Sequence, residues 1–301
     1  MKNVLVIYYS QSGQLKEIAE SITHPLIKEE NVHVDFYKIE LETDFPFPWT
    51  GDVFFDVFPE TFQQIPSAIK APPQLILDTQ YDLILFHYQV WYLTPSIPIN
   101  SFLKSTYAQT IMKGKPVITV SGSRNMWAKA QDKVKALLLD NGATLVGNIA
   151  MTDRHGNWIS VVTIVDWMFA GIKRKAYGIF PLPGVSKKDI AHSTQYGETI
   201  LSYLNRNSYE GMQVDLVRQG AVPFKFFLVS MDQKGNRMFA VWSSLILKDA
   251  TKRKFLVNAF KYYVIIAIYL ISPIVFLLEM LLFPLLYFIK IKKEKKHYLG
   301  L

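Results

Sequence analysis

The sequence predicts an α/β fold: a five-stranded parallel sheet in the order 2-1-3-4-5, with helices on both faces and a helical extension after it. Short apolar runs alternate with segments of helical spacing over the first 150 residues, which is typical of strands joined by crossover helices. The runs are apolar throughout, so each strand is expected to be buried on both faces of the sheet. A third observation, an apolar stretch near the C-terminus between groups of lysines, predicts membrane association.

Five runs rich in β-branched and aromatic residues are the predicted strands. They cover residues 4–9, 32–39, 81–87, 116–121 and 144–150. Helices are expected between them, because apolar residues recur there at helical spacing and turn residues such as Asn141 and Gly142 end the pattern. The helices within this part cover residues 15–22, 97–107 and 128–140.

Residues 43–75 interrupt this alternation between the second and third strands. They hold six prolines and seven aromatic residues. Prolines at this density exclude a long helix, although a short one over residues 52–63 is compatible with them. So many rings must be buried against something. We expect them to pack on the body of the domain or to form a hydrophobic lid over a cofactor or an apolar substrate, and the two roles are compatible.

The chain divides into a predicted α/β domain, a helical extension packed on it and a membrane anchor, over residues 1–150, 151–247 and 248–301. In the extension, an apolar helix is expected over residues 159–172, followed by a turn or short strand over residues 178–184. Another helix is expected from Ser186 to about Asn205, because Ser186 and Asp189 have the spacing of a capping box.

The composition excludes several classes of enzyme. The chain has no cysteine, which excludes disulfides, thiolate nucleophiles and cysteine metal sites. Its six histidines are scattered and no two have the spacing of metal ligands, so a metal enzyme is not expected. The sequence begins with a predicted strand and not with the pattern of a cleavable signal peptide, so the catalytic part is expected in the cytoplasm.

The net charge of +8 is concentrated toward the C-terminus. From Lys248 onward there are ten basic and three acidic residues, a charge of +7, which leaves +1 for the body and gives no reason to expect nucleic acid as a partner. The expected partner is a membrane surface, with residues 255–296 holding the protein at the inner face.

The apolar part of this anchor covers residues 262–289. Its 28 residues fit neither one span nor two, and both flanks are basic, so we expect a re-entrant or in-plane helical hairpin bent near Pro273. One tilted span with the C-terminus outside is the alternative. A buried helix of a soluble protein is disfavoured by the flanking lysines.

The first predicted strand is followed by a short polar turn that opens a helix, Ser10-Gln11-Ser12-Gly13-Gln14-Leu15. The first amides of a helix have no partner within it, and the helix dipole directs positive charge to the same point, so the turn can bind an anion. Ser10 and Ser12 add hydroxyl donors, and Gly13 permits close approach of the backbone. The turn lacks the glycines of a dinucleotide fingerprint and the lysine of a P-loop. It resembles the FMN phosphate loop of flavodoxin-like proteins; an ordinary turn capped by Ser12 is the alternative.

Two further loops are expected beside this turn, because ligands of parallel sheets bind beyond the carboxyl ends of the strands, where the strand order reverses. The loop after the third strand contains Gln89-Val90-Trp91-Tyr92, which offers aromatic walls and backbone donors for an isoalloxazine ring. The loop after the fourth strand contains Gly122-Ser123-Arg124-Asn125. We expect Trp91 or Tyr92 to stack on the ring and Arg124 to stabilise the negative charge of a reduced flavin, although a core role for Trp91 is the alternative.

Three motifs carry a resemblance to a known family: Pro46-Phe47-Pro48-Trp49, Val90-Trp91-Tyr92-Leu93-Thr94-Pro95-Ser96-Ile97-Pro98 and Arg124-Asn125-Met126-Trp127. Residues 1–150 resemble the flavin and quinone reductase branch of the flavodoxin-like fold. Residues 1–245 are similar to the dialkylresorcinol condensing enzymes of aryl-polyene and flexirubin-type pigment pathways. Because the chain has no cysteine for a ketosynthase nucleophile, the resemblance implies the other role in that family, an FMN-dependent aromatase. It also implies a homodimer, a ketosynthase as pathway partner, and NAD(P)H as an optional reductant.

The aromatase would oxidise a lipophilic cyclic 1,3-dione to a dialkylresorcinol, with a base taking a proton and the flavin accepting a hydride. His87 and His155 are the candidate bases, since an ordinary histidine pKa of about 6.5 suits proton transfer at neutral pH, and either is equally open to a structural role. Tyr88 and Tyr92 are expected to hydrogen-bond the dione oxygens. Arg154 would hold a carboxylate if the substrate carries one.

Three other functions remain open at this point. The first is an NAD(P)H-dependent FMN or quinone reductase with a soluble substrate, in which bound flavin is reduced rapidly by NAD(P)H. The second is a flavodoxin-type electron carrier at the membrane, although the neutral body argues against the acidic docking surface of such carriers. The third is a structural homologue that binds no flavin.

Overall fold

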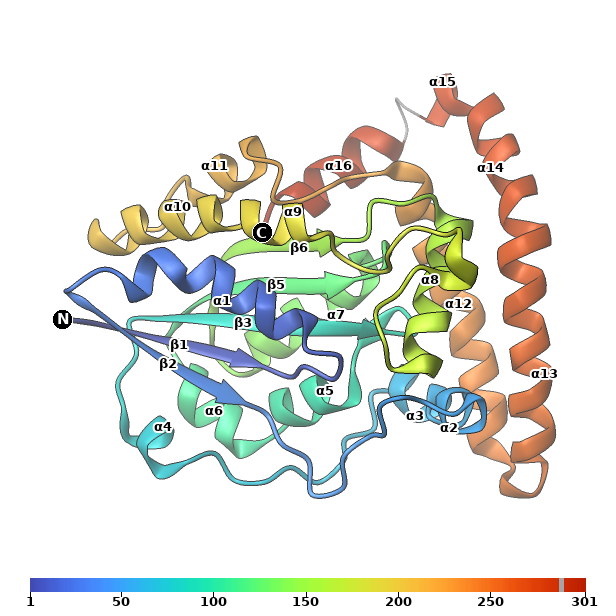
Figure 1. The fold of residues 1–301 in the computed structure, drawn as a ribbon, viewed down its shortest axis with the longest axis horizontal. Coiled ribbons are helices and arrows are strands. Elements are labelled where there is room, and N and C mark those ends of the chain that lie inside the picture. Colours follow the sequence, from blue (N-terminus) through green and yellow to red (C-terminus); the bar gives the residue numbers. More distant parts are fainter. Residues whose placement is uncertain (287–289) are drawn as a thin grey trace.

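The computed structural model describes residues 1–286 and 290–301 (Figure 1). Its centre is a sheet of five parallel strands, β2 (Val32–Lys38), β1 (Lys2–Tyr8), β3 (Leu83–Trp91), β5 (Pro116–Ser123) and β6 (Thr144–Thr152), adjacent in that order. All five predicted strands and their 2-1-3-4-5 order are confirmed. The sequence prediction lacks β4 (Thr94–Pro95), a two-residue strand that pairs antiparallel with the end of β3. β3 also runs four residues beyond its predicted end, as far as Trp91.

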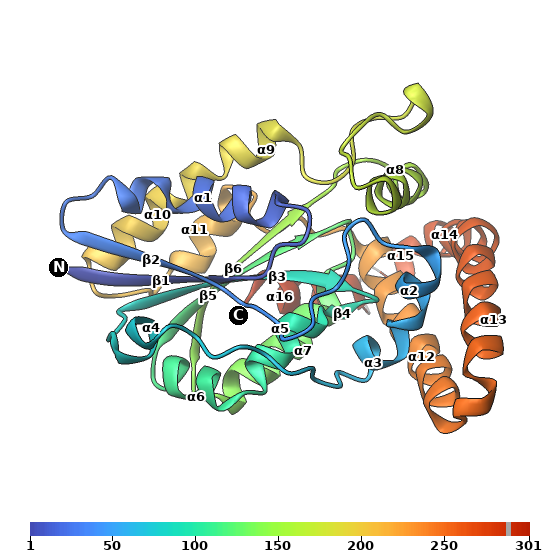
Figure 2. The ribbon, with the colours of Figure 1, turned by 60° about the horizontal axis from the view of Figure 1, so that its bottom comes forward.

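Helices cover both faces of the sheet, as predicted (Figure 2). One face is covered by α1 (Gln14–Ile27), α10 (Thr194–Asn205) and α11 (Met212–Arg218). The other face is covered by α5 (Ile97–Leu103), α6 (Thr106–Met112) and α7 (Ala128–Asp140). The single helix predicted over residues 97–107 is two helices, because the Ser105 hydroxyl accepts a hydrogen bond from the Ala108 amide at 3.2 Å and starts α6 anew.

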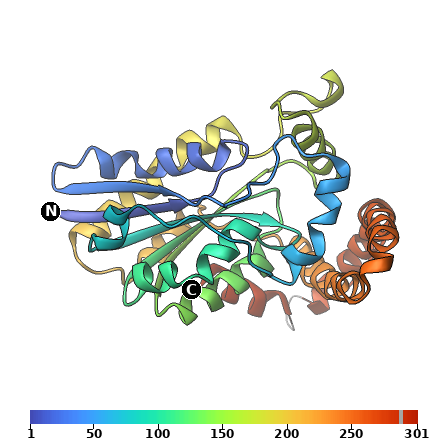
Figure 3. The same ribbon diagram turned by 90° about the horizontal axis from the view of Figure 1, so that it is seen from below.

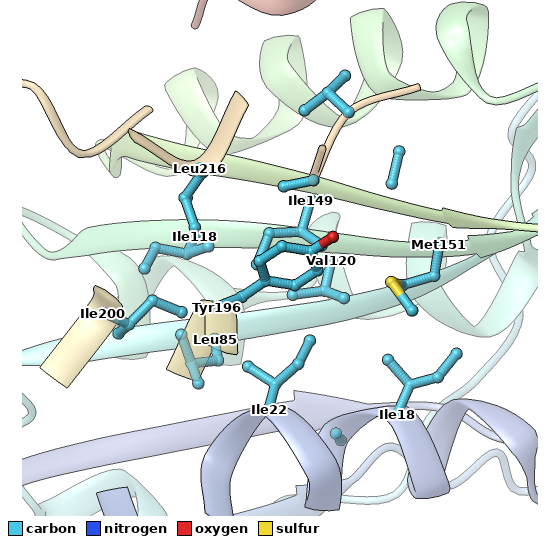
Figure 4. Packing of buried hydrophobic residues seen from close by; sticks show 14 of the residues in the cluster. Ile18, Ile22, Leu85, Ile118, Val120, Ile149, Met151, Tyr196, Ile200 and Leu216 are labelled. Carbon is cyan, nitrogen blue, oxygen red and sulfur yellow. The ribbon is translucent and has the colours of Figure 1, made fainter. Parts of the chain in front are cut away.

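Alternate residues of each strand enter opposite apolar layers, as the pleat of a strand requires. Figure 4 shows the layer on the α1 side, where Ile18 and Ile22 of α1 face Leu85 and Val120 of the sheet. Tyr196 of α10 lies in the same layer and is buried. Residues 151–247, predicted as a helical extension packed on the domain, supply two of the helices that cover this face.

The insert between β2 and β3 forms α2 (Gly51–Asp56), α3 (Phe58–Phe62) and α4 (Gln74–Asp78). The first two are the short helix predicted there, and Thr50 caps α2 by accepting a hydrogen bond from the Val53 amide. Figure 3 shows α2 between the end of the sheet and the C-terminal helices. The insert thus has the sheet on one side and those helices on the other.

Residues after β6 begin with α8 (Asn157–Ala170) and η1 (Ala176–Gly178). The predicted helix from Ser186 is divided into α9 (Lys187–His192) and α10. Its predicted cap is confirmed: the Asp189 amide donates to the Ser186 hydroxyl at 3.0 Å, and that hydroxyl donates to the Asp189 carboxylate at 2.8 Å.

The C-terminal part consists of α12 (Phe226–Lys248) and a long second helix beside it (Figure 1). The second helix joins η2 (Ala250–Lys252), α13 (Arg253–Ile266), a π-helical segment η3 (Ala267–Ile271) and α14 (Ser272–Leu281). By length and composition alone, its 32 residues would suffice to cross a membrane. The predicted hairpin near Pro273 is wrong, because the helix continues through Ser272 and Pro273 without reversing.

The chain then returns to the body. α15 (Phe283–Leu286) and α16 (Lys292–Leu299) follow α14, and residues 287–289 of the predicted anchor lie outside the described residues. The Tyr298 hydroxyl donates to the Asp132 carboxylate at 3.1 Å, and the Tyr298 ring packs edge-on against Trp127. The segment after the long helix therefore contacts the same globular body as the start of that helix does through Arg253.

α12 is joined to the sheet domain through Asp232, whose side chain is fully buried. Its Oδ2 accepts a hydrogen bond at 3.0 Å from the Lys129 amide in the first turn of α7. Burial raises the pKa of Asp232 to about 7, against the opposing effects of this hydrogen bond and of the Lys129 charge. The negative charge of Asp132 raises the pKa of Asp232 further.

This raised pKa predicts a pH-dependent stability. The folded protein holds the Asp232 proton up to about pH 7, whereas the unfolded chain releases it near the ordinary pKa of 3.8. The resulting stabilisation is fully present below pH 3.8 and is lost as the pH rises through 7. Asp232→Asn keeps a side-chain oxygen that can accept the hydrogen bond from the Lys129 amide, but it removes the group that titrates. The free energy of unfolding is measured in urea at pH 5 and at pH 8. We expect its decrease between these two pH values to be smaller in the variant than in the wild type by on the order of 2 to 4 kcal/mol. An equal decrease in both proteins would contradict the raised pKa of Asp232.

Candidate functional site

The three predicted loops meet at the carboxyl end of the sheet around one cavity of about 270 Å³. This volume is close to the lower end of ordinary ligand pockets. Most of the wall is apolar or aromatic. The lining residues from the three loops are Gln11, Ser12, Gln14, Leu15, Gln89, Val90, Trp91, Tyr92, Gly122, Ser123 and Arg124. Ser10, Gly13 and Asn125, predicted with them, do not line the cavity.

The first loop has the geometry of an anion site. Gly13 precedes α1 in the left-handed conformation, with φ 87°, and no side chain of the described residues caps the helix. The alternative of a turn capped by Ser12 is therefore wrong. The Ser10 hydroxyl is buried and has no hydrogen-bond partner among the described residues. Uncapped amides and a free hydroxyl are what a bound phosphate needs.

Two glutamines of the same loop fix it to neighbouring segments. The Gln14 amide forms two hydrogen bonds with the backbone of Val185, donating to its oxygen at 3.0 Å and accepting from its nitrogen at 2.9 Å. The Gln11 amide donates to the Pro46 oxygen at 2.9 Å and accepts from the Trp49 indole at 3.0 Å. The loop is thereby held between the insert and the segment before α9.

Trp91 belongs to an aromatic cluster and does not stand free. Its ring packs edge-on against Tyr9, Phe45 and Trp49, with the Phe45 and Trp49 centroids each 5.3 Å away. Its indole nitrogen donates to the Gln89 side chain at 3.1 Å. Trp91 also lines the cavity, so a core position and a place in the cavity wall coexist, while stacking on a flavin ring stays a prediction.

Tyr92 also lines the cavity, but its hydroxyl donates to the carbonyl oxygen of Phe54 in α2. The predicted hydrogen bond to a substrate oxygen would require this contact to break. Its backbone has a positive φ of 48°, at the tight turn between β3 and β4. Tyr92 is better described as a residue that holds α2 over the cavity.

Among the described residues that line the cavity, Arg124 is the only charged one. Its guanidinium donates to the Asn157 carbonyl and side-chain oxygens at 3.0 and 2.7 Å and to the Ser160 hydroxyl at 3.1 Å, all at the start of α8. Burial lowers the pKa of Arg124 to about 10, so it remains charged at neutral pH, and Asp153 favours the charged form. Next to it, the Ser123 hydroxyl is buried without a partner among the described residues.

The predicted roles of His87 and Tyr88 need correction. His87 lies within β3, four residues before its end, and is fully buried, with Nδ1 3.2 Å from the Leu85 oxygen. Burial lowers its pKa to about 4, so it is neutral and inaccessible to a substrate. Tyr88 lies in the apolar layer on the α5–α7 side of the sheet, and its hydroxyl donates a hydrogen bond to the Gln131 side chain at 2.7 Å. Neither residue lines the cavity.

His155 and Arg154 also lie apart from the cavity lining. His155 Nδ1 is 2.6 Å from the buried carboxylate of Asp153, so the pair is a local structural contact. Arg154 is largely exposed and forms an ion pair with Asp189 at 2.8 Å. Asn125 donates to the Asn157 side chain and so supports the start of α8. The predicted substrate roles of His155 and Arg154 are not retained.

Part of the cavity wall comes from residues that the sequence interpretation did not assign to the site. α8 contributes three of them and the insert four, while Ile18 and Gly184 complete the wall. These residues are Ile164, Trp167, Met168, Phe47, Trp49, Phe54, Val57, Ile18 and Gly184. The insert therefore packs on the body and also lines the cavity, while its role as a lid over a cofactor or substrate stays a prediction. α2 and α8 meet above the cavity, where the Phe54 and Phe169 rings pack edge-on with centroids 5.9 Å apart.

Solved structures similar to this chain are flavodoxin-like flavoproteins. A flavoprotein from Lactobacillus acidophilus, solved in complex with FMN, is 21% identical over 50% of this chain and 93% of its own, with a TM-score of 0.38. Oxidised flavodoxin 1 from Bacillus cereus is 15% identical over 67% of this chain and 99% of its own, with a TM-score of 0.38. A flavodoxin from the domain Archaea is 15% identical over 68% of this chain and 99% of its own, with a TM-score of 0.37. No protein-family profile and no curated protein sequence matches the chain.

The strand order decides the fold class. The parallel strands lie in the order β2-β1-β3-β5-β6, which is the order 2-1-3-4-5 when the short antiparallel β4 is not counted. A doubly wound sheet in this order, with its cavity at the switch point between β1 and β3, is the flavodoxin-like arrangement. The fold is flavodoxin-like.

Proposed function

We propose that the protein is an FMN-dependent oxidoreductase that acts on a lipophilic cyclic substrate. One observation carries the proposal: an uncapped helix-opening turn and a mostly apolar cavity with a single arginine adjoin each other at the switch point of the sheet. FMN has a dianionic phosphate and a flat ring with an apolar end and a polar edge. The turn at Ser10 and Ser12 suits the phosphate. The wall at Leu15, Trp91 and Trp167 suits the ring.

When bound, FMN supplies a two-electron hydride acceptor. The chain supplies the surroundings. Arg124 favours negative charge on the ring system beside it, and its three hydrogen bonds to α8 keep the guanidinium in place. The apolar roof from α2 and α8 limits the access of water and favours an apolar substrate. The Ser123 hydroxyl is available to a polar ring edge.

The substrate proposed is a cyclic 1,3-dione with two hydrocarbon chains, which the resemblance of residues 1–245 to dialkylresorcinol condensing enzymes suggests. Its aromatisation to a dialkylresorcinol removes one hydride and one proton from the ring. In the part of the chain that the structure describes, no histidine, aspartate or glutamate lines the cavity. A cyclic 1,3-dione is a vinylogous acid, so it can lose a proton to solvent and bind as an enolate near Arg124, without a base from the chain.

The phosphate site is tested by Ser12→Asp, which adds a carboxylate to the turn. A negative charge at the start of a helix is compatible with folding, so the variant is expected to fold. FMN should bind to it at least about ten-fold more weakly than to the wild type, because the two anions repel each other. Riboflavin, which lacks the phosphate, should bind equally to both. The measurement is a titration followed by flavin fluorescence.

The matched control is Ser12→Asn, which has the same size and no charge and should retain FMN binding within a few-fold. Equal affinities of FMN for the Asp and Asn variants would disprove the phosphate site. The reaction is tested separately: without oxygen, the dione should bleach bound flavin and yield one aromatic product per flavin. Bleaching by NAD(P)H but not by the dione would replace the aromatase by the reductase alternative.

A further inference from the structure

The outward side of the long C-terminal helix is a continuous apolar surface. One stripe of side chains at helical spacing is exposed along α13, η3 and α14; we call it the outer stripe. It consists of Phe255, Tyr262, Ile266, Leu270, Ile274, Leu277 and Leu281, each between 50% and 74% exposed. In the most apolar 18-residue stretch of this helix, only 6% is buried within the protein. An exposed apolar surface of this extent is typical of an interaction site.

The only charged residue between Tyr262 and Leu286 is turned away from this stripe. It is Glu279, whose carboxylate accepts hydrogen bonds from the Lys234 ammonium and the Ser230 hydroxyl of α12. The Glu279 side chain is 13% exposed. The charge is thus paired on the inner side, and the outer stripe carries none.

Along the chain, positive charge flanks the stripe on both sides. Lys252 and Lys254 are exposed at its start, and four lysines of α16 are exposed beyond its end: Lys292, Lys293, Lys295 and Lys296. An apolar stripe with lysines at both ends complements a bilayer surface with anionic headgroups, where each basic residue adds to the attraction.

The helix is attached to the body along its whole length, which is incompatible with crossing a bilayer. At its start, Arg253 binds the Asp56 and Glu60 carboxylates at 2.7 Å each. In the middle, the Trp158 indole of α8 donates to the Ile268 oxygen at 3.1 Å. Near its end is the Glu279 contact. If the helix crossed the bilayer, α12 with exposed Lys234 and Arg237 would enter the hydrocarbon beside it, which is costly.

We propose that this protein docks on an anionic bilayer through the outer stripe, with α13 and α14 lying parallel to the membrane plane and not crossing it. The docking itself does not depend on the proposed function; only its use, the delivery of a lipophilic substrate, rests on that function. The roof of the cavity is attached to the same helix: Phe58 of α3 stacks on Phe260 of α13 with centroids 3.7 Å apart, and Tyr92 packs on Phe58. A lipophilic substrate dissolved in the bilayer would therefore reach the cavity at the seam between α2 and α8, where Phe54 meets Phe169.

The absence of cysteine makes the docking geometry directly measurable on the full chain. Single cysteines at Phe255, Leu270 and Leu281 place a polarity-sensitive fluorophore at the start, middle and end of the stripe. Leu139→Cys is the matched control, because Leu139 is 74% exposed, as Leu281 is, and lies in the last turn of α7, shortly before the start of β6 at Thr144. The membrane is a vesicle of phosphatidylcholine and phosphatidylglycerol.

We expect the three stripe labels to shift to the blue together on vesicle addition and to be quenched equally by a quencher at headgroup depth, while the Leu139 label does not change. Salt or pure phosphatidylcholine should weaken binding. Deep burial of the Leu270 label, with the Phe255 and Leu281 labels on opposite leaflets, would mean a span and overturn the proposal. Labels already shielded without vesicles, in a particle of twice the mass, would mean that a second copy covers the stripe and would also overturn it.

A charge in the stripe provides a second test. Leu270→Asp should weaken vesicle binding at least ten-fold, and Leu139→Asp should leave it unchanged. Equal binding of the two variants would disprove docking through the stripe. FMN titration of Leu270→Asp should match the wild type, so loss of docking and loss of the flavin site are distinguished in the same variant.

Discussion

Replacement of Gly197 by alanine is expected to lower the free energy of unfolding by at least about 3 kcal/mol. Gly197 lies in α10 where this helix crosses α1. A Cβ at this position would lie 1.9 Å from the carbonyl oxygen of Ile22 and 3.0 Å from Pro25 Cδ. The obstacle is helix backbone and not the end of a flexible side chain, so one helix must move away from the other. Such a movement opens the layer that contains Ile22 and Tyr196, both buried. Urea unfolding followed by circular dichroism measures the effect.

Gly51→Ala is the control for this substitution. Gly51 begins α2, and a Cβ there would meet nothing within 4 Å. Alanine is the better helix former, so the stability of this variant should be unchanged or rise by up to about 1 kcal/mol. If Gly197→Ala unfolded at the same urea concentration as Gly51→Ala, the close crossing of α1 and α10 would be refuted.

The sheet and the position of the cavity could be predicted from the sequence because both depend on local pattern and general topology. Apolar runs mark strands that are buried on both faces, and ligands of such sheets bind at the switch point. The loops at Ser12, Trp91 and Arg124 accordingly line one cavity. The individual hydrogen bonds could not be predicted from the sequence, because the partners are far apart along the chain. Gln14 binds Val185, 171 residues away, and Arg124 binds Asn157, 33 residues away.

His87 illustrates a limit of locating a strand end from apolar residues alone. Its position at the end of an apolar run suggested the mouth of the sheet, but β3 continues past His87 to Trp91 and includes the polar residue Gln89. The four additional residues bury His87 beneath the cavity edge. The pairing of β3 with β4 and β5 sustains this extension, and such pairing is a tertiary effect that propensity does not report.

Pro273 shows a similar limit in the C-terminal helix. A proline within an apolar stretch commonly marks a break, which favoured a hairpin. Here Pro273 falls in the first turn of α14, directly after the π-helical segment Ala267–Ile271, and the helix direction is kept. The wider π-helical turn changes the hydrogen-bond pattern just before the proline, where its missing amide is tolerated.

Phe260→Ala is expected to cost about 3 to 5 kcal/mol, and the loss should be confined to the C-terminal helices and the insert helices that pack on them. Phe260 is fully buried, stacks on Phe58 and packs edge-on against Phe239. Their cluster shares no residue with the two layers of the sheet. The amides of α13 should therefore exchange with deuterium much faster in the variant, while those of β1 and β3 keep their protection.

Phe255→Ala is the matched control, because it removes the same ring from the same helix at a position that is 72% exposed. Its stability should stay within about 0.5 kcal/mol of the wild type. The two phenylalanines lie on opposite sides of α13, and their variants separate its two roles. Loss of Phe260 should detach the helix from the roof of the cavity, whereas loss of Phe255 should weaken vesicle binding without changing α13 exchange. If both variants changed exchange equally, α13 would not have one side for the protein and another for the membrane, and the in-plane docking of the outer stripe would lose its structural basis.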